Sequence, residues 1–258
     1  IIDVSDRSRQ PLTDPSLGLT VTFNGCIYNY KALRRELEAL GYAFFSGGDT
    51  EVIAKAWHAW GPDCVERFMG MFAFAVHELE SGAVTLVRDR LGIKPLYIAR
   101  LGRGDRIRYA SSLPALLAGG DIDTSLNHAA LHHYFSFHSV VPAPLTLLNG
   151  VEKIPPASIV RFERDGRRTE RSYWQLEFPN DPADAQRSPE AWREDVRAAL
   201  QTAVERRMVS DVPVGVLLSG GLDSSLIVAL LARNGAHGLN TFSIGFDTVD
   251  DEAGDEFE

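Results

Sequence analysis

The chain has 258 residues, a formal net charge of −9, 45% hydrophobic residues and 24% charged residues, which is ordinary for a globular protein. This composition excludes collagen-like, disordered and disulfide-scaffold chains, and the length allows one large or two medium domains. The acidic balance disfavours a nucleic-acid-binding protein that relies on phosphate contacts. Seven of the 35 acidic residues lie after Phe246, however, so the rest of the chain is nearly neutral.

The termini and cysteines bear on the compartment. Cys26 and Cys64 are too few for a disulfide-dependent secreted scaffold. No apolar run approaches the roughly 18 residues of a membrane-spanning helix, and residues 1–6 lack a signal-peptide pattern. We therefore expect a cytoplasmic protein with neither membrane nor nucleic-acid partners. The chain starts without Met, in a stretch that reads as a strand entered part-way, so we expect a truncated N-terminus.

Short strands and helices alternate in the first part of the chain. Apolar alternation predicts strands, and apolar residues three or four apart predict helices. The predicted strands are 19–23, 27–30, 71–76, 84–88 and 106–111, with a hairpin of 159–163 and 168–174. The predicted helices are 31–40, 51–60 and a helix capped by Asn127 that ends near Phe137.

The composition changes after residue 176. Residues 177–187 are polar and contain two prolines, which is typical of a linker. A long helix is predicted over 188–208, followed by a strand at 214–218, a helix at 223–234 and a strand at 241–246. Strand, helix and strand in succession predict a parallel βαβ unit.

A glycine-containing loop, LSGGLDSS at 218–225, joins the first of these strands to the helix. Its two glycines permit a tight turn that brings main-chain N–H groups close to a ligand, and the helix N-terminus attracts an anion. Ser219 and Ser224 add hydroxyl donors, and Asp223 could hold a magnesium ion that bridges phosphates. No Gly-Lys-Ser/Thr follows, so the loop is not a Walker motif. The alternative is a turn without a ligand.

Two further motifs have a structural alternative of their own. Asn24-Gly25 lies between alternating apolar segments, and by itself this pattern favours a type I′ hairpin turn over a functional role. Asp49 lies just before a predicted helix and could simply cap it, although Thr50 could do the same and leave Asp49 free.

Several motifs together resemble the glutamine-hydrolysing asparagine synthetase family, over essentially the whole chain. The SGGLDSS run after an apolar strand is similar to the pyrophosphate loop of ATP pyrophosphatases, and MVSDVPVG at 208–215 precedes it as in this family. FNGCIYN at 23–29 resembles the family's glutaminase motif. SGGDTE at 46–51 is similar to the segment whose Asp pairs with the substrate α-amino group. RDRLGIKPLY at 88–97 also matches, and its charges are expected to organise a loop beneath the glutamine pocket.

The resemblance implies two domains. The first, 1–176, would be a class II glutamine amidotransferase domain, an α+β four-layer amidohydrolase sandwich of the N-terminal-nucleophile (Ntn) type, truncated at its N-terminus. The linker would be 177–187. Residues 188–258 would start an α/β ATP pyrophosphatase domain, similar to the adenine nucleotide alpha hydrolases.

The resemblance also implies the glutamine site. Asn24 and Gly25 would supply the oxyanion hole, since a side-chain amide and a main-chain N–H must point to the developing charge. The nucleophile in this family is an N-terminal cysteine whose own amino group acts as base, and this chain lacks it. We therefore expect the chain alone to be inactive as a glutaminase, with Cys26 a packed thiol. Cys26 stands where most members carry Glu. The implied glutamine-binding residues are Ile1, Ile2, Asn24, Gly25, Cys26 and Asp49.

For the second site the resemblance implies ATP and Mg²⁺, with Asp223 as the metal ligand. The implied ATP-binding residues are Leu218, Ser219, Gly220, Gly221, Asp223, Ser224 and Ile244. By contrast, His128, His132 and His133 lack the third ligand or catalytic Glu of a zinc site, so we expect them on a surface or between the domains.

The implied activity is that of an ATP-dependent carbon–nitrogen ligase. Glutamine would provide ammonia, and a carboxylate activated as its adenylate would receive it, giving an amide, glutamate, AMP and pyrophosphate. Aspartate is the default acceptor. Cys26 together with FSFHSVVPAP at 135–144 also resembles a branch proposed to amidate the dipeptide N-acetylglutaminylglutamine. A non-catalytic ATP-binding homologue is a third reading, and formation of a homodimer is left open.

Overall fold

The computed structural model describes residues 1–102, 106–233, 235 and 238–244. It forms two compact units: a larger unit, Asp3–Glu177, and a smaller unit, Phe178–Glu258 together with Ile1–Ile2. The predicted domain boundaries at 176 and 188 stay a prediction. The acidic end of the chain at 247–258, residues 245–246 of the predicted last strand, and residue 234 of the predicted last helix lie outside the described residues.

The larger unit contains two antiparallel sheets. The six-stranded sheet has the order β1 (Leu12–Asp14), β2 (Leu19–Ile27), β3 (Gly70–Glu78), β4 (Val84–Arg88), β8 (Ser158–Phe162), β9 (Arg168–Ser172). The three-stranded sheet has the order β6 (Arg106–Ala110), β5 (Tyr97–Leu101), β7 (Glu152–Lys153). The α-helices are α1 (Tyr30–Ala39), α2 (Asp49–Trp60), α3 (Leu113–Leu117) and α4 (His128–Ser136), and short 3₁₀ helices cover Asp6–Ser8 and Gly61–Arg67.

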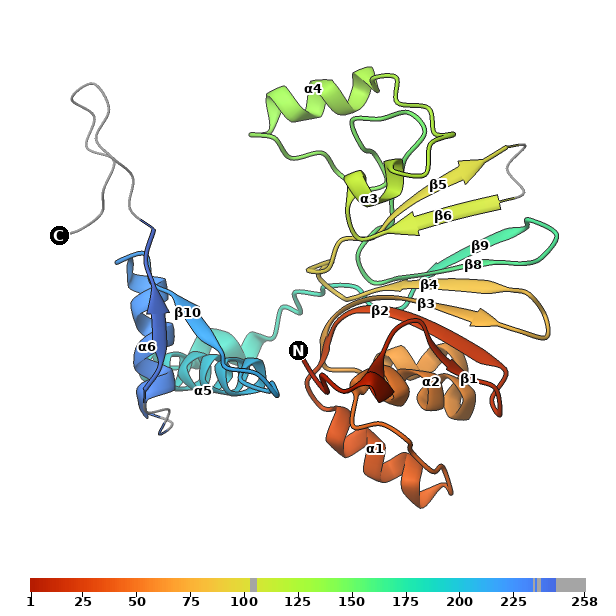
Figure 1. Ribbon diagram of the computed structural model, residues 1–258. Coiled ribbons are helices and arrows are strands. Elements are labelled where there is room, and N and C mark those ends of the chain that lie inside the picture. Colours follow the sequence, from red (N-terminus) through yellow and green to blue (C-terminus); the bar gives the residue numbers. More distant parts are fainter. Residues whose placement is uncertain (103–105, 234, 236–237, 245–258) are drawn as a thin grey trace. The chain divides into compact units, whose positions relative to one another are not determined.

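These elements form four layers. Helix α2 packs on β1 and β2 and against α1, while α3 packs on β5 and β6 of the other sheet. Figure 1 shows α1 and α2 below the six-stranded sheet, with β5, β6 and α3 above it. The predicted four-layer α+β sandwich is therefore confirmed.

Strand β3 lies at the centre of the core because both of its faces are covered. Phe72 and Phe74 point to the helical side, where the Phe74 ring meets Trp57 edge to face with centroids 6.3 Å apart. Ala73 and Ala75 point to the other sheet, in a cluster with Leu86, Leu96, Ile98, Ile154, Val160 and Phe162. Each fully buried Leu, Ile, Val or Phe side chain contributes about 1.5–3 kcal/mol of transfer free energy. Because successive side chains of a strand point to opposite faces, β3 contributes to the apolar core on each side of the sheet.

The turn predicted at Asn24-Gly25 is wrong. Both residues lie inside β2, which pairs with β3 without a break from Leu19 opposite Glu78 to Ile27 opposite Gly70. A Cβ atom on Gly25 would lie 2.1 Å from the carbonyl oxygen of Met71. The glycine is needed for close strand packing, and nine paired residues override the local turn preference.

Other differences are local. The strand predicted at 27–30 is wrong, because Tyr30 begins α1, and the expected strand at the N-terminus is absent from residues 1–5. Helix α2 begins at Asp49, and its N-cap residue Gly48 makes no side-chain capping bond, so neither Asp49 nor Thr50 is the cap. Strand β4 has its predicted bounds, and Asn127 caps α4, its Oδ1 accepting from the Ala130 N–H at 3.0 Å.

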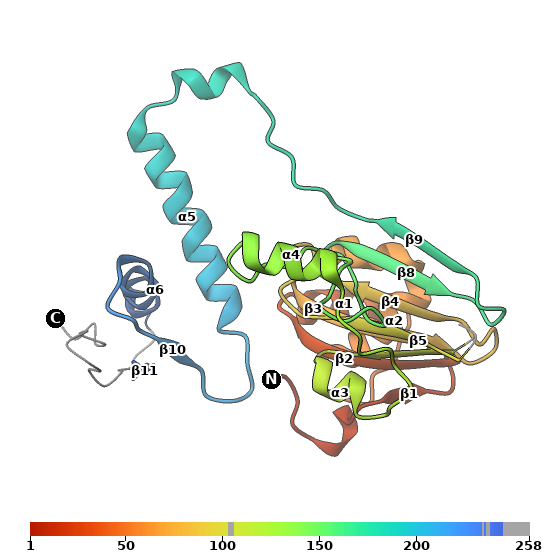
Figure 2. The same ribbon diagram turned by 90° about the horizontal axis from the view of Figure 1, so that it is seen from above.

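The smaller unit consists of a short 3₁₀ helix, Pro182–Gln186, then α5 (Pro189–Arg207), β10 (Gly215–Leu217), α6 (Leu222–Arg233) and β11 (Asn240–Phe242). Ser188 caps α5 by accepting from the Ala191 N–H at 3.2 Å. Figure 2 shows α5 as one long helix. Strands β10 and β11 are parallel and joined through α6, which confirms the predicted βαβ unit.

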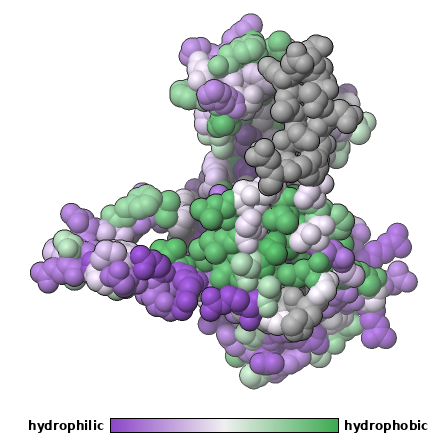
Figure 3. All heavy atoms as spheres, turned by 90° about the vertical axis from the view of Figure 1, so that its left-hand side faces the viewer, coloured by the Kyte–Doolittle hydropathy of each residue, from purple (hydrophilic) through white to green (hydrophobic). Residues whose placement is uncertain are grey.

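Few apolar residues of the smaller unit are buried. Its core cluster holds Val204, Leu230 and Leu231, packed against Met208, Val216 and Leu239. Other apolar side chains are open, and Leu222 and Phe242 are 84% and 58% exposed. Figure 3 shows apolar side chains gathered over the face of this unit that is turned to the viewer. Among the helices that the structure describes, none is long and apolar enough to span a membrane.

Candidate functional site

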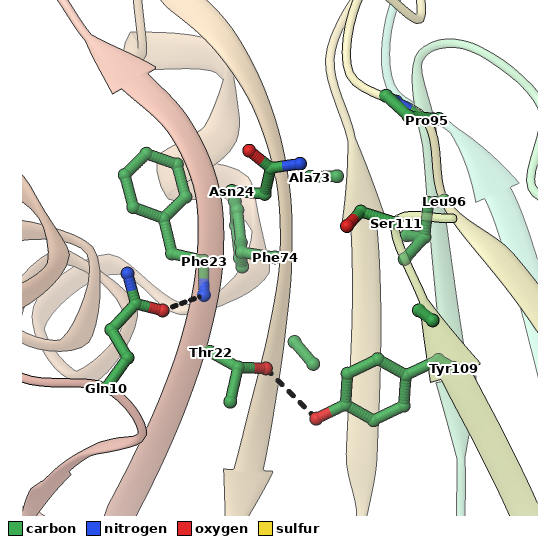
Figure 4. A pocket seen from close by; sticks show the side chains of 12 residues that line it. Gln10, Thr22, Phe23, Asn24, Ala73, Phe74, Pro95, Leu96, Tyr109 and Ser111 are labelled. Atoms are coloured by element: carbon green, nitrogen blue, oxygen red, sulfur yellow. Dashed lines mark hydrogen bonds between the residues drawn. The ribbon is translucent and has the colours of Figure 1, made fainter. Parts of the chain in front are cut away.

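A cavity of about 190 Å³ lies between the two sheets of the larger unit. Thr22 and Asn24 of β2 line one side, and Tyr109 and Ser111 line the other (Figure 4). The Thr22 and Tyr109 hydroxyls bridge the two sheets at 3.0 Å. The Gln10 side-chain oxygen accepts from the Phe23 N–H at 2.6 Å, which fixes the main chain next to Asn24. The cavity therefore has mainly apolar walls with a few fixed polar groups, as binding sites commonly do.

Asn24, Gly25 and Cys26 are adjacent on β2, near the end of the strand. Side chains two residues apart on a strand share a face, so Asn24 and Cys26 point to the same side of the sheet. Their partners on β3 are Ala73 and Met71. The Asn24 side chain lines the cavity (Figure 4), which gives its amide a place to act on a ligand.

Asp49 reaches the same end of β2 from the first turn of α2. Its Oδ2 accepts a hydrogen bond from the Ile27 N–H at 3.0 Å, and its side chain is buried. Burial raises the pKa of the Asp49 carboxyl to about 6. The structure thus places the Asp49 carboxylate next to Cys26 and three residues from Asn24 along β2; the sequence predicted all three for one site. At neutral pH, Asp49 is a buried carboxylate suited to hold a cationic group.

The two thiols are poor nucleophiles. Burial, together with the negative charge of Asp49, raises the pKa of Cys26 to about 11. Cys64 is fully buried, and its pKa is also raised by burial. Since the thiolate is the reactive form, both environments favour the packed thiol that the sequence predicted for Cys26.

Arg88 and Asp89 organise the loop after β4, as the sequence predicted for this charged motif. The Arg88 guanidinium donates to the carbonyl oxygens of Lys94 at 2.8 Å and Gly92 at 2.7 Å. The buried Asp89 carboxylate accepts from the N–H groups of Phe72, Leu91, Ile93 and Lys94. The bond to Phe72 ties this loop to β3 directly opposite Gly25.

Other predicted residues lie elsewhere. Ile1 is exposed and Ile2 is buried, and both belong to the smaller unit, so their role toward glutamine stays a prediction. His128 and His132 are exposed on α4, and His133 is half-buried with its Nδ1 unpartnered within the described chain. Among the described residues, no three His, Cys, Asp or Glu side chains gather as a metal site would require.

The predicted nucleotide loop lies between β10 and α6. Gly220 has a φ of +83°, a left-handed conformation that glycine adopts without strain. The Ser219 and Ser224 hydroxyls are 3.3 Å apart, and Ser224 also donates to the Gly221 carbonyl oxygen at 3.1 Å. Leu218 donates its N–H to Phe242 of the neighbouring strand at 2.8 Å. The loop is therefore held at the carboxyl end of a parallel strand, where α/β proteins bind ligands.

The donors at this loop fit a nucleotide with magnesium. Ser219, Gly220 and Gly221 are exposed, and Asp223 is an exposed carboxylate in the first turn of α6. Magnesium is commonly held by one or two carboxylates together with substrate phosphates, so a single Asp is sufficient. Ile244, the predicted adenosine contact, is 72% exposed in the segment after β11.

Comparison with known families agrees with this arrangement. Residues 1–174 match the family model described as glutamine amidotransferase domain. The chain belongs to the glutamine amidotransferase family. Residues 195–258 match a second model, described as asparagine synthase. The two matches confirm the family resemblance drawn from the sequence motifs, while the dipeptide branch stays a prediction.

Curated relatives show the same pairing. The chain is 34% identical to asparagine synthetase [glutamine-hydrolyzing] 3 of Bacillus subtilis, covering 97% of this chain and 40% of that protein. It is 37% identical to asparagine synthetase [glutamine-hydrolyzing] 1 of the same organism, with 96% and 38% covered. Asparagine synthetase B of Escherichia coli is 34% identical, with 92% and 36% covered. The chain therefore spans about two fifths of the length of these relatives.

One group near Asp49 was missed by sequence reasoning. Glu51 and Lys55 of α2 form a buried ion pair at 3.1 Å, and Lys55 also pairs with Asp14 of β1 at 3.0 Å. The four-residue spacing of Glu51 and Lys55 was a usable signal, since such pairs share a helix face. Nothing in the sequence indicated that Asp14 would join them.

Proposed function

We propose that the larger unit is the glutamine-hydrolysing half of an ATP-dependent amide synthetase. The observation that carries this proposal is that Asn24 lines the cavity, while the Asp49 carboxylate binds the Ile27 N–H three residues further along the same strand, next to Cys26. Asn24 and the Gly25 N–H act as the oxyanion hole, and the Asp49 carboxylate binds the α-ammonium group of glutamine. Family membership and the curated relatives support the same assignment.

The nucleophile in this proposal is a cysteine that precedes Ile1 in the full-length protein. The raised pKa values of Cys26 and Cys64 support this, because neither thiol ionises readily. Cys26 is a neutral, compact group in place of the family's usual Glu, so the pocket carries less negative charge around the substrate's ammonium group.

The smaller unit begins the half that uses ATP. The loop Ser219–Ser224 holds the pyrophosphate, Asp223 holds the magnesium ion, and Leu218 and Ile244 contact adenosine. When bound, ATP supplies the activating group that makes the acceptor carboxylate reactive toward ammonia. Support comes from the exposed glycine turn, the paired serine hydroxyls and the match to the asparagine synthase model.

The test uses the full-length protein, incubated with glutamine, ATP and Mg²⁺ and with aspartate as the acceptor. We expect AMP and glutamate to form together, with asparagine as the product. Asn24→Ala should lower the kcat for glutamine hydrolysis about 100-fold, because one oxyanion donor is lost. Amide synthesis from added ammonia should stay within about twofold. If no AMP forms with any of the acceptors tested, the proposal is contradicted.

N-acetylglutaminylglutamine is a second candidate acceptor, because Cys26 and the segment at 135–144 resemble the branch proposed to amidate this dipeptide. The same assay with N-acetylglutaminylglutamine separates the two: turnover with the dipeptide and none with aspartate would assign the dipeptide branch. If the protein binds the nucleotide but forms no AMP in the presence of either acceptor, it is a non-catalytic homologue. The 258-residue chain by itself should release no glutamate from glutamine, and release would identify Cys26 or Cys64 as the nucleophile.

A further inference from the structure

The loop before Asp49 is anchored through nearly all of its main-chain donors. Phe45 and Ser46 donate their N–H groups to the Glu51 carboxylate at 3.0 and 2.7 Å, and the Ser46 hydroxyl donates to the same carboxylate at 2.6 Å. Gly47 donates its N–H to Asp3 at 2.7 Å. Gly48 donates its N–H to the Ser46 hydroxyl at 3.3 Å. The path of the loop is therefore set by two carboxylates.

Glu51 is the central anchor. Its side chain is fully buried, and both carboxylate oxygens accept hydrogen bonds from the loop. Lys55 supplies the positive charge at 3.1 Å, and the Phe44 and Phe45 rings lie 5.2 and 5.5 Å from its ammonium group. A buried carboxylate needs such a partner, because an unpaired buried charge is strongly destabilising.

The anchor leads directly to the proposed substrate contact. Helix α2 has Gly48 at its N-cap, which offers no side chain, and the Glu51 carboxylate in its first turn binds the preceding loop. Asp49 is the first residue of that turn, and its Oδ2 lies 3.0 Å from the Ile27 nitrogen. A shift of the loop would move the Asp49 carboxylate away from the end of β2.

We propose that Glu51 is a positioning residue that fixes Asp49 for binding the α-ammonium group of glutamine. This inference rests on the proposed function of Asp49. Glu51 does not touch the substrate, and it acts by holding Phe45 and Ser46. Because Gln at position 51 would place an NH₂ group opposite N–H donors, the nearly isosteric Glu51→Gln change breaks the anchor without removing bulk.

Asp14 offers a matched control. It belongs to the same buried ion cluster, bonded to Lys55 and Ser16, and it makes none of the bonds to the loop that Glu51 makes. Asp14→Asn and Glu51→Gln both weaken the buried cluster, so both should lower the melting temperature. Only Glu51→Gln should change glutamine binding.

The experiment measures glutamine hydrolysis and ammonia-supported amide synthesis in the full-length protein. Glu51→Gln should raise the KM for glutamine about tenfold and leave kcat within about threefold, and Ser46→Ala should raise KM about threefold. Asp14→Asn should leave KM within about twofold, and the ammonia-supported rate should be equal in all variants. An unchanged KM in Glu51→Gln, or an equal rise in Asp14→Asn, would overturn the inference.

Hydrogen exchange of the full-length protein separates this inference from the proposed function. The Phe45 and Ser46 amides should exchange at least about tenfold faster in Glu51→Gln, and at the wild-type rate in Asp14→Asn. If the wild type hydrolyses no glutamine, the proposed function fails, and the exchange rates still decide whether Glu51 holds the loop. Equal rates in the wild type and Glu51→Gln would show that it does not.

Discussion

The two units solve the problem of presenting a ligand site in opposite ways. In the larger unit, the residues of the proposed glutamine site lie on a strand and a helix whose inner faces are covered, and Asp49 is almost fully buried. In the smaller unit, the proposed nucleotide loop is exposed, and within the described residues it rests on a two-stranded sheet of three residues per strand. Such a sheet is marginal by itself. Burial therefore shapes the chemistry of the first site, while the second depends on turn geometry.

The largest difference in stability between the two units should come from replacing a phenylalanine in each. Phe74 of β3 is 1% exposed and contacts the Trp57, Phe68 and Phe72 rings. Phe74→Ala should lower the free energy of unfolding by about 4 kcal/mol, because it leaves a cavity among packed rings. Phe242→Ala, at a side chain 58% exposed in β11, should change it by less than about 1 kcal/mol. Urea titration followed by tryptophan fluorescence and circular dichroism measures both. Equal losses would remove the contrast between the units.

Glycine gives the next contrast. Gly25→Ala forces a Cβ atom against the Met71 carbonyl oxygen, so we expect a loss of about 3 kcal/mol in the free energy of unfolding. At Gly221 the nearest atom to a new Cβ is the Ser219 hydroxyl oxygen at 3.5 Å, an ordinary contact. Gly221→Ala should therefore cost less than about 1 kcal/mol. Thermal melts report both, and a tolerated Gly25→Ala would mean that β2 and β3 can separate locally.

The pH dependence of stability tests whether burial sets the charge state of the Asp49 carboxyl. The folded-state pKa of Asp49 is raised above 3.8 to about 6, so the unfolded chain releases this proton first. Stability contributed by the protonated form is present below about pH 4 and is lost as pH rises to about 6, by about 2 kcal/mol. Asp49→Asn should remove this loss and abolish glutamine turnover. Denaturant midpoints at pH 4.5 and pH 7 measure it. Asp223→Asn, at an exposed position of the smaller unit, is the matched variant, and an equal change in both variants would contradict the assignment of the effect to Asp49.

The smallest contrast concerns arginine. Arg161 of β8 donates to both oxygens of Glu78, at 2.5 and 2.9 Å, and also to Glu163, and it is about one-quarter exposed. Arg161→Ala should cost about 1 kcal/mol. Arg197 of α5 pairs with Glu194 at the open surface, and Arg197→Ala should cost less than about 0.5 kcal/mol. Melts at low and high salt check both, since only the open pair is strongly screened.

The elements that sequence reasoning predicted well are those fixed by local chemistry. Asn127 caps its helix as expected, and the helix predicted to start at 188 begins at Pro189, directly after its cap Ser188, because a cap depends only on the next three residues. The βαβ unit was predictable from strand, glycine turn and helix in order. The site residues were proposed from the FNGCIYN and SGGDTE motifs, and their roles stay a prediction.

What could not be predicted depends on contacts between distant residues. Asn24-Gly25 has the local signature of a turn, and only its pairing with Ala73 and Phe72 shows that it lies within a strand. Besides Glu51, Lys55 pairs with Asp14, which lies 41 residues earlier on another element. The burial that raises the pKa of Asp49 likewise comes from packing against β2, which the motif does not encode.

The extended path of β2 through Asn24-Gly25 also has a bearing on the chemical ageing of the protein. In a mobile turn, the main-chain nitrogen after an Asn can attack the side-chain amide carbon, and an Asn-Gly pair is the least hindered case. In β2, the nitrogen of Gly25 is held in a strand paired along its whole length with β3. The sheet that aims the Asn24 amide into the cavity thereby also protects it from slow deamidation.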